Sequence, residues 1–236
     1  MKQRALTLGI VALLGATLAL PALAQTGQKS SSTDNSPAQS KGEERADANK
    51  HVDRALQAVQ TMEKDLRLKK LMQQAKGIYI IPDYGRAALG VGAQGGAGVL
   101  LVHQQGKWSG PGFYNFGGIS LGPQAGVTAG PVAMLLMGDK ALNIFNSNNK
   151  FSLSADVGLT IARYSARETG TAGQGDIIMW SGEKGAMAEM NVGVTDVNFD
   201  EKETRGYYGK DVTAQQIVSG GMSAPKAQKL LGALPK

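Results

Sequence analysis

The chain has 236 residues, of which 42% are hydrophobic, 19% are charged and only 6% are aromatic, and its formal net charge is +6. Cysteine is absent, which excludes disulfides, iron–sulfur clusters, thiolate metal sites and cysteine nucleophiles. Only two histidines are present, so a zinc site built from imidazoles is not expected. The 32 glycines have no collagen-like period, and they indicate tight turns, bulges and closely packed backbone.

The first 24 residues have the pattern of a secretory signal peptide. Lys2 and Arg4 form the charged start, residues 5–20 form an apolar stretch, and residues 22–24 (Ala-Leu-Ala) form a small-x-small cleavage site. An uncleaved membrane anchor is the alternative, but the apolar run is short for a span of about 20 residues. We therefore expect cleavage before Gln25 and a periplasmic or secreted protein.

Residues 25–47 are small and polar, and they contain no large apolar side chain. Such a segment cannot bury enough surface to fold, so it is predicted to be a disordered linker. From Ala48 onward, apolar residues recur three or four positions apart, as on one face of a helix. The phase of this pattern slips near Asp65, which predicts two consecutive helices that end before Gly77.

After Gly77, short apolar or alternating runs predict strands. The predicted strands are 78–81, 99–102, 113–121, 132–137, 151–161, 177–180 and 186–199. Helices are expected over 139–146, 213–218 and 225–234. This order indicates an α+β fold: a mostly antiparallel, glycine-rich β core of sandwich or barrel-like form, with N-terminal amphipathic helices and C-terminal helices. We place it in one domain, residues 48–236.

Trp108, in a turn between two predicted strands, is expected to be a packing residue.

Motifs for catalysis are weak. Residues 90–95 match the G-x-G-x-x-G pattern, but a predicted strand follows instead of a helix, and no acidic residue stands about 20 positions later. No G-x-S-x-G elbow is present, and a catalytic triad would have to use His51 or His103, each of which is expected to be an ordinary structural residue. The polar loop 146–149 lacks nearby carboxylates for calcium. The sequence therefore predicts a non-enzymatic protein with no cofactor and no metal.

A group of cations interleaved with apolar residues is more informative. The cations are Lys64, Arg67, Lys69, Lys70 and Lys76, and the interleaved apolar residues are Leu66, Leu68, Leu71 and Met72. Of these, Leu68, Leu71 and Met72 are the side chains expected to contact lipid. A helix of this kind can lie in the interface of an anionic bilayer, with its cations on phosphates and its apolar side chains inserted. The alternative is that the apolar face packs on the β core and the cations are solvated. Nucleic acid is not expected, because the net charge is modest and the chain is predicted to be exported.

Several motifs resemble, in consistent order, the SYLF domain, a family of lipid-binding domains that is also known as actin-binding in yeast. They are residues 75–82 (AKGIYIIP), 92–101 (GAQGGAGVLL), 106–111 (GKWSGP), 117–118, 122–126, 139–142, 184–185 and 207–209. The resemblance covers about residues 66–234. It implies a phosphoinositide- or anionic-lipid-binding module whose N-terminal amphipathic helix contributes to membrane contact. The family's pattern is not kept at residues 85–90, 162–167 and 185–189, so the resemblance does not specify a headgroup.

Two hypotheses follow. The first is a lipid-binding or membrane-binding protein of the bacterial cell envelope that binds anionic phospholipid through the basic helix and the β core. The alternative is a structural or interaction module of the envelope that binds a protein partner through its β surface.

Overall fold

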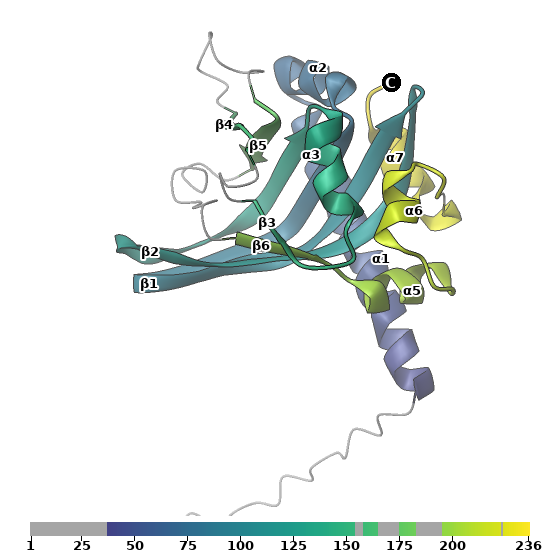
Figure 1. Cartoon of the computed structure of the whole chain (residues 1–236), viewed down its shortest axis with the longest axis horizontal. Helices are drawn as coiled ribbons and strands as arrows, with labels where there is room; N and C mark the ends of the chain where they lie inside the picture. The colour runs from purple at the N-terminus through teal and green to yellow at the C-terminus, as the bar shows by residue number, and fades with distance from the viewer. Residues whose placement is uncertain (1–36, 154–157, 165–174, 183–194, 223) are drawn as a thin grey trace, which may run out of the picture. The chain divides into compact units, whose positions relative to one another are not determined.

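The computed structural model describes residues 37–153, 158–164, 175–182, 195–222 and 224–236. These residues belong to one unit of the chain, and Figure 1 labels its elements. The predicted signal peptide and residues 25–36 of the predicted linker lie outside this part of the chain.

The first helix, α1 (Pro37–Met62), begins well before the predicted boundary at Ala48. The linker prediction is therefore wrong for residues 37–47. The physical reason is a contact between α1 and α5 (Glu201–Tyr208) that the polar sequence does not reveal. A Cβ atom at Gly206 would lie 2.7 Å from the Cβ of Glu44, and Arg45 Nε donates to the Gly206 carbonyl over 3.5 Å. Small or polar residues here pack helix against helix without an apolar stripe.

The break between α1 and α2 (Leu66–Gln74) confirms the prediction of two helices. Asp65 is the N-cap of α2, and its Oδ1 accepts hydrogen bonds from the backbone N–H groups of Arg67 and Leu68, at 2.9 and 3.1 Å. These bonds satisfy two of the amides that a helix start leaves without partners. The N-cap therefore fixes where the second helix starts and how it faces the sheet.

The central feature is one long hairpin of β1 (Gly77–Gln104) and β2 (Lys107–Leu136). Four separately predicted strands, 78–81, 99–102, 113–121 and 132–137, are parts of these two. The turn residues Gln105 and Gly106 have φ of 51° and 70°, as a tight two-residue hairpin turn requires.

The hairpin is strongly bent, so that the two ends of β1 come together. The His103 backbone N–H donates to the Lys76 carbonyl over 2.8 Å, although 27 positions separate them in the chain. Further along, a Cβ at Gly98 would lie within 2.7 Å of the Tyr79 ring. The pairing register of β1 and β2 shifts at three places, and such irregularities allow a two-stranded ribbon to bend. Figure 1 shows the resulting curled sheet.

The remaining strands extend this sheet. They are β3 (Phe151–Ser152), β4 (Ile161–Arg163), β5 (Ile177–Ser181) and β6 (Thr195–Phe199). The order is β3-β6-β2-β5-β4, with β1 on β2, and only the β4–β5 pairing is parallel. This confirms the α+β prediction with a mostly antiparallel, barrel-like core. Residues 186–194 of the last predicted strand lie outside the described residues.

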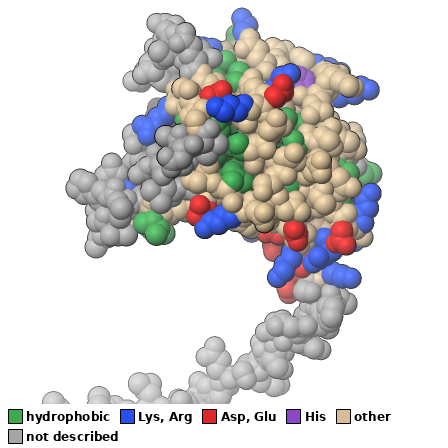
Figure 2. Space-filling model, in the orientation of Figure 1, with side chains coloured by type: hydrophobic (Ala, Val, Ile, Leu, Met, Phe, Trp, Pro, Cys, Tyr) green, Lys and Arg blue, Asp and Glu red, His purple; other side chains and the backbone are tan. Residues whose placement is uncertain are grey.

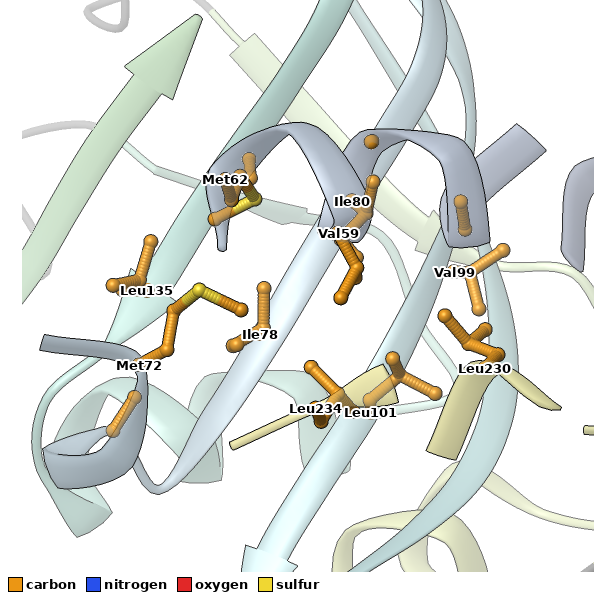
Figure 3. Close-up of a cluster of buried hydrophobic side chains, with 14 of the residues drawn as sticks. Val59, Met62, Met72, Ile78, Ile80, Val99, Leu101, Leu135, Leu230 and Leu234 are labelled. Carbon is orange, nitrogen blue, oxygen red and sulfur yellow. The ribbon is translucent and has the colours of Figure 1, made fainter. Parts of the chain in front are cut away.

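The other helices are α3 (Asp139–Asn143), η1 (Ile144–Asn146), α6 (Ala214–Val218), η4 (Pro225–Ala227) and α7 (Gln228–Ala233). Side chains alternate across the sheet, so Ile78 and Ile80 face one core cluster while Tyr79 and Ile81 face another. The first cluster lies under α1, α2 and α7. Figure 3 shows part of it, with Val59, Met62 and Met72 packed against Ile78, Ile80 and Leu135.

Candidate membrane-contact surface on α2 and its preceding turn

The apolar face of α2 packs on the sheet. Leu68 and Met72 are fully buried and Leu71 is almost so, and all three belong to the core cluster under α1, α2 and α7. Figure 3 shows the Met72 side chain beside Met62, Ile78 and Leu135. These three side chains, which were predicted to insert into a bilayer, pack on the sheet in this structure, because the spacing i, i+3, i+4 directs them at it.

The outward side of α2 carries a different apolar residue. Leu66, the first residue of α2, is 76% exposed. From the sequence it was one of the apolar residues between the cations, but it was not among those expected to contact lipid. Leu66 is not three or four positions from Leu68, Leu71 or Met72, so it does not share their side of the helix. This spacing was the signal in the sequence that Leu66 would face outward. Lys64 and Lys70 are exposed, whereas Arg67 and Lys69 are half-buried. An exposed leucine therefore lies among cations at the start of this helix.

The structure divides the five predicted cations by their surroundings. Lys64 lies in the turn that precedes α2, whereas Arg67 and Lys70, three positions apart, share one side of the helix. Lys69 Nζ lies 3.3 Å from Glu63 Oε1. Lys76 lies beyond α2, with Nζ 4.0 Å from Asp139 Oδ1. We therefore define the α2 surface as Lys64, Leu66, Arg67 and Lys70.

The start of this surface is anchored to the sheet side of the molecule. The Tyr164 hydroxyl donates to Asp65 Oδ2 over 2.6 Å, which links the N-cap of α2 to the residue that follows β4. Burial alone would raise the pKa of Asp65, but the bonds from Tyr164 and from two backbone amides outweigh it and lower the pKa. Asp65 therefore stays ionised, and α2 is held in a fixed orientation.

The β surface offers a second exposed apolar area. On β2, Ile119 is 54% exposed and Val127 is 83% exposed. They pair with Ala93 and Ala87 of β1, in the stretch between the two ends of the long hairpin. This is the described part of the β core at which a lipid or a protein partner could bind.

The two histidines have structural surroundings. His51 Nδ1 lies 2.6 Å from Glu203 Oε1, between α1 and α5, and His103 stacks on Trp108 with ring centroids 4.4 Å apart. Trp108 Nε1 donates to the Pro235 carbonyl over 2.8 Å, so Trp108 is a packing residue as predicted. Among the described residues, no three His, Asp or Glu side chains are grouped to hold a metal ion. Within the same residues, no helix has the length and apolar character to cross a bilayer.

Comparison with known proteins identifies the family. The profile of the Ysc84 family, described as Las17-binding protein actin regulator, matches residues 117–236. The chain belongs to this family. The resemblance to the SYLF domain is thereby confirmed, and the matched range runs from the middle of β2 through α7. The α2 surface precedes that range, so its role rests on its own geometry.

Named proteins that are similar to this Ysc84 family member share less than a quarter of their aligned residues with it. Protein YSC84 of Saccharomyces cerevisiae is 24% identical over 163 residues, which cover 66% of this chain and 35% of the yeast protein. SH3 domain-containing YSC84-like protein 1 of Bos taurus is 23% identical over 160 residues, which cover 66% of this chain and 46% of the bovine protein. The chain thus spans less than half the length of these relatives. No solved structure matches it.

Proposed function

We propose that this Ysc84 family member is a non-enzymatic module that binds membranes containing anionic phospholipid, and that the α2 surface makes the contact. The observation that carries the proposal is Leu66, 76% exposed at the start of α2 and accompanied by Lys64, Arg67 and Lys70. Cations near an anionic bilayer each contribute about 1 kcal/mol. Burial of one leucine contributes about 1.5–3 kcal/mol more.

The mode of contact differs from insertion of an amphipathic helix. Because Leu68, Leu71 and Met72 are already buried, the helix binds with its outward side and inserts one side chain. Such binding is peripheral and reversible, and it weakens with salt because the Debye length falls to about 3 Å at 1 M. We place this contact in a bacterial cell envelope, reached by export after removal of residues 1–24, with anionic phospholipid as the partner.

Vesicle flotation tests the proposal. The variant Lys64→Gln, Arg67→Gln, Lys70→Gln should bind phosphatidylglycerol-containing vesicles about a hundredfold less tightly, since three contributions of about 1 kcal/mol are lost. The matched control is Lys202→Gln, Lys226→Gln, Lys229→Gln, which removes three exposed cations from α5, η4 and α7. The control should bind like the parent, and neither variant should differ on neutral phosphatidylcholine vesicles.

Leu66→Ser separates the apolar from the electrostatic part of the contact. We expect weaker vesicle binding with an unchanged melting temperature, since Leu66 contributes little to the core. If the triple α2 variant binds anionic vesicles as tightly as the parent, the α2 surface is not the contact.

A protein partner is the second candidate, and the exposed Ile119 and Val127 on β2 favour it. The double variant Ile119→Ser, Val127→Ser should then abolish partner binding and leave vesicle binding intact. A parent protein that binds no vesicle of any composition would favour this candidate over the first.

A further inference from the structure

A pocket lies between α1 and the end of α5, at a place that the α2 surface does not include. It has a volume of about 270 Å³, close to the lower end of the range of about 300–1,000 Å³ in which proteins hold small molecules. Its walls are Lys41, Glu44, Arg45, Arg205, Gly206, Gly209, Lys210 and Asp211. Figure 2 shows charged side chains of both signs where Figure 1 places α1 and α5.

The charge of the pocket favours an anion. Four cations, Lys41, Arg45, Arg205 and Lys210, oppose two carboxylates, Glu44 and Asp211. Arg205 Nη1 lies 3.8 Å from Asp211 Oδ1, an open pair between two well-exposed side chains. Guanidinium groups offer planar pairs of N–H donors that match phosphate oxygens, and the two lysines add point charges.

The floor of the pocket is built before any ligand arrives. At Gly206 the two helices approach so closely that a Cβ atom would meet the Cβ of Glu44 at 2.7 Å and the backbone N of Arg45 at 3.2 Å. Gly209 then ends α5 in the left-handed conformation, with φ of 71°, and the chain turns to supply Lys210 and Asp211. A preorganised pocket loses little conformational entropy on binding.

One buried oxygen atom beside the pocket, Glu44 Oε2, has no hydrogen-bond donor among the described residues. A buried acceptor without a donor is costly, so a ligand that carries an N–H or O–H group is favoured once the Glu44 side chain turns this oxygen toward the pocket. Inorganic phosphate at neutral pH carries hydroxyl groups only on the phosphorus that the cations would bind, so it has no separate group for this oxygen.

We propose that this pocket binds a small phosphate monoester that also carries a hydroxyl or ammonium group. The phosphate lies among Arg45, Arg205 and the two lysines, and the hydroxyl or ammonium group donates to Glu44. The same chemistry is found in free metabolites and in those lipid headgroups that combine a phosphate monoester with a free hydroxyl. The inference rests on the pocket alone and stands whether or not the α2 surface binds membranes.

Calorimetric titration of the full chain tests this with three probes: glycerol 3-phosphate, phosphoethanolamine and inorganic phosphate. We expect both esters to bind, and at least one of them to bind more tightly than inorganic phosphate. Lys210→Gln, at an exposed position that cannot disturb folding, should weaken ester binding about tenfold, and Arg45→Gln together with Lys210→Gln should weaken it further. Lys202→Gln, an exposed position of α5 outside the pocket, is the matched control and should bind like the parent.

Glu44→Gln should reduce the preference for the ester over inorganic phosphate, because it replaces one carboxylate oxygen. Competition identifies the source of the ligand. If vesicles containing lysophosphatidic acid, which has a free hydroxyl beside its phosphate monoester, displace glycerol 3-phosphate, the ligand is a lipid headgroup, and if they do not, it is a soluble ester. A parent that binds neither ester, or a Lys210→Gln variant that binds like the parent, overturns the proposal.

Discussion

The close approach of the two ends of β1 can be tested at Gly98. A Cβ atom added there would lie 2.7 Å from both Cζ and the hydroxyl oxygen of Tyr79, and closer still to Cε2. Tyr79 is fully buried, packs against Phe145 with ring centroids 5.3 Å apart, and donates its hydroxyl hydrogen to the Tyr114 carbonyl over 2.9 Å. Because the ring is fully buried among these neighbours, Gly98→Ala requires either the ring or the strand to shift.

The expected loss in the free energy of unfolding of Gly98→Ala is the sum of two contributions. Overpacking a well-packed core costs about 1–3 kcal/mol. If the ring shifts far enough to break the bond to Tyr114, an unpaired buried hydroxyl adds about 1–3 kcal/mol. The sum is about 2–6 kcal/mol, out of a total stability of about 5–15 kcal/mol for a domain. At about 2–4 °C per kcal/mol for a chain of this size, the melting temperature should fall by roughly 4–24 °C.

Thermal unfolding followed by circular dichroism measures the effect. Gly117→Ala is the matched control, because a Cβ there would meet no described atom within 4 Å and the variant should melt within a degree or two of the parent. The double variant Gly98→Ala, Tyr79→Leu should be less destabilised than the sum of the single variants, since the clash is shared. If Gly98→Ala melts like the parent, the two ends of β1 do not lie as close as described.

Two further outcomes are expected. The hydrogen bond with Glu203 raises the pKa of His51 above its usual 6.5, although burial opposes it, and Asp47 and Asp83 act in the same direction as Glu203. The folded state thus holds a proton more tightly than the unfolded chain. This contribution to the free energy of unfolding is complete below about pH 6.5 and is lost as the pH rises through the raised value. Urea unfolding at about pH 6 and pH 8 should reveal the loss, and His51→Gln should reduce it. Trp108→Ala should cost about 2–3 kcal/mol, since it removes the stack on His103 and the bond to Pro235. Loss of vesicle binding without loss of stability would instead make Trp108 a ligand contact.

Local patterns in the sequence were sufficient to predict the helix starts that have an N-cap side chain and the strands that have an apolar run. The phase slip at Asp65 marked a true N-cap, and Thr213, predicted to start a helix, forms a capping box with Gln216. The continuous apolar run 78–81 predicted a strand, and its side chains enter the two core clusters in turn. In each case the atoms that decide the structure are within a few positions of one another in the chain.

Contacts between segments that are far apart in the chain could not be predicted from such local patterns. The start of α1 depends on Gly206, more than 150 positions later, and nothing in residues 37–47 signals a partner. The strand ends at Ile81 and Val99 were interpreted as separate elements, because glycine and proline between them usually end strands. Here the same residues bend one long ribbon.

The cations of the candidate site were predicted from the sequence, but its exposed leucine was not. Cations are nearly always exposed, so the basic character of residues 64–70 could be inferred directly. Which leucine faces outward depends on where the sheet lies. Leu68 and Leu66 have the same side chain, but the capped start of α2 directs the first into the core and the second into solvent.

This geometry predicts that α2 stays docked when the protein binds a membrane. If α2 lifted, Leu68, Leu71 and Met72 could be buried again in the bilayer, but the core face under them, which includes Met62, Ile78 and Leu135, could not. Exposing three such side chains costs about 5–9 kcal/mol, at about 1.5–3 kcal/mol each. Three cations at an anionic surface return only about 3 kcal/mol. Hydrogen exchange therefore should be as slow at the Ala75 amide, which donates to the Leu71 carbonyl over 3.1 Å, with phosphatidylglycerol vesicles as without them. A Leu66→Trp reporter should shift its emission to shorter wavelength under the same conditions. Faster exchange at Ala75 on vesicles would show that the helix leaves the sheet and that its buried face, rather than Leu66, enters the bilayer.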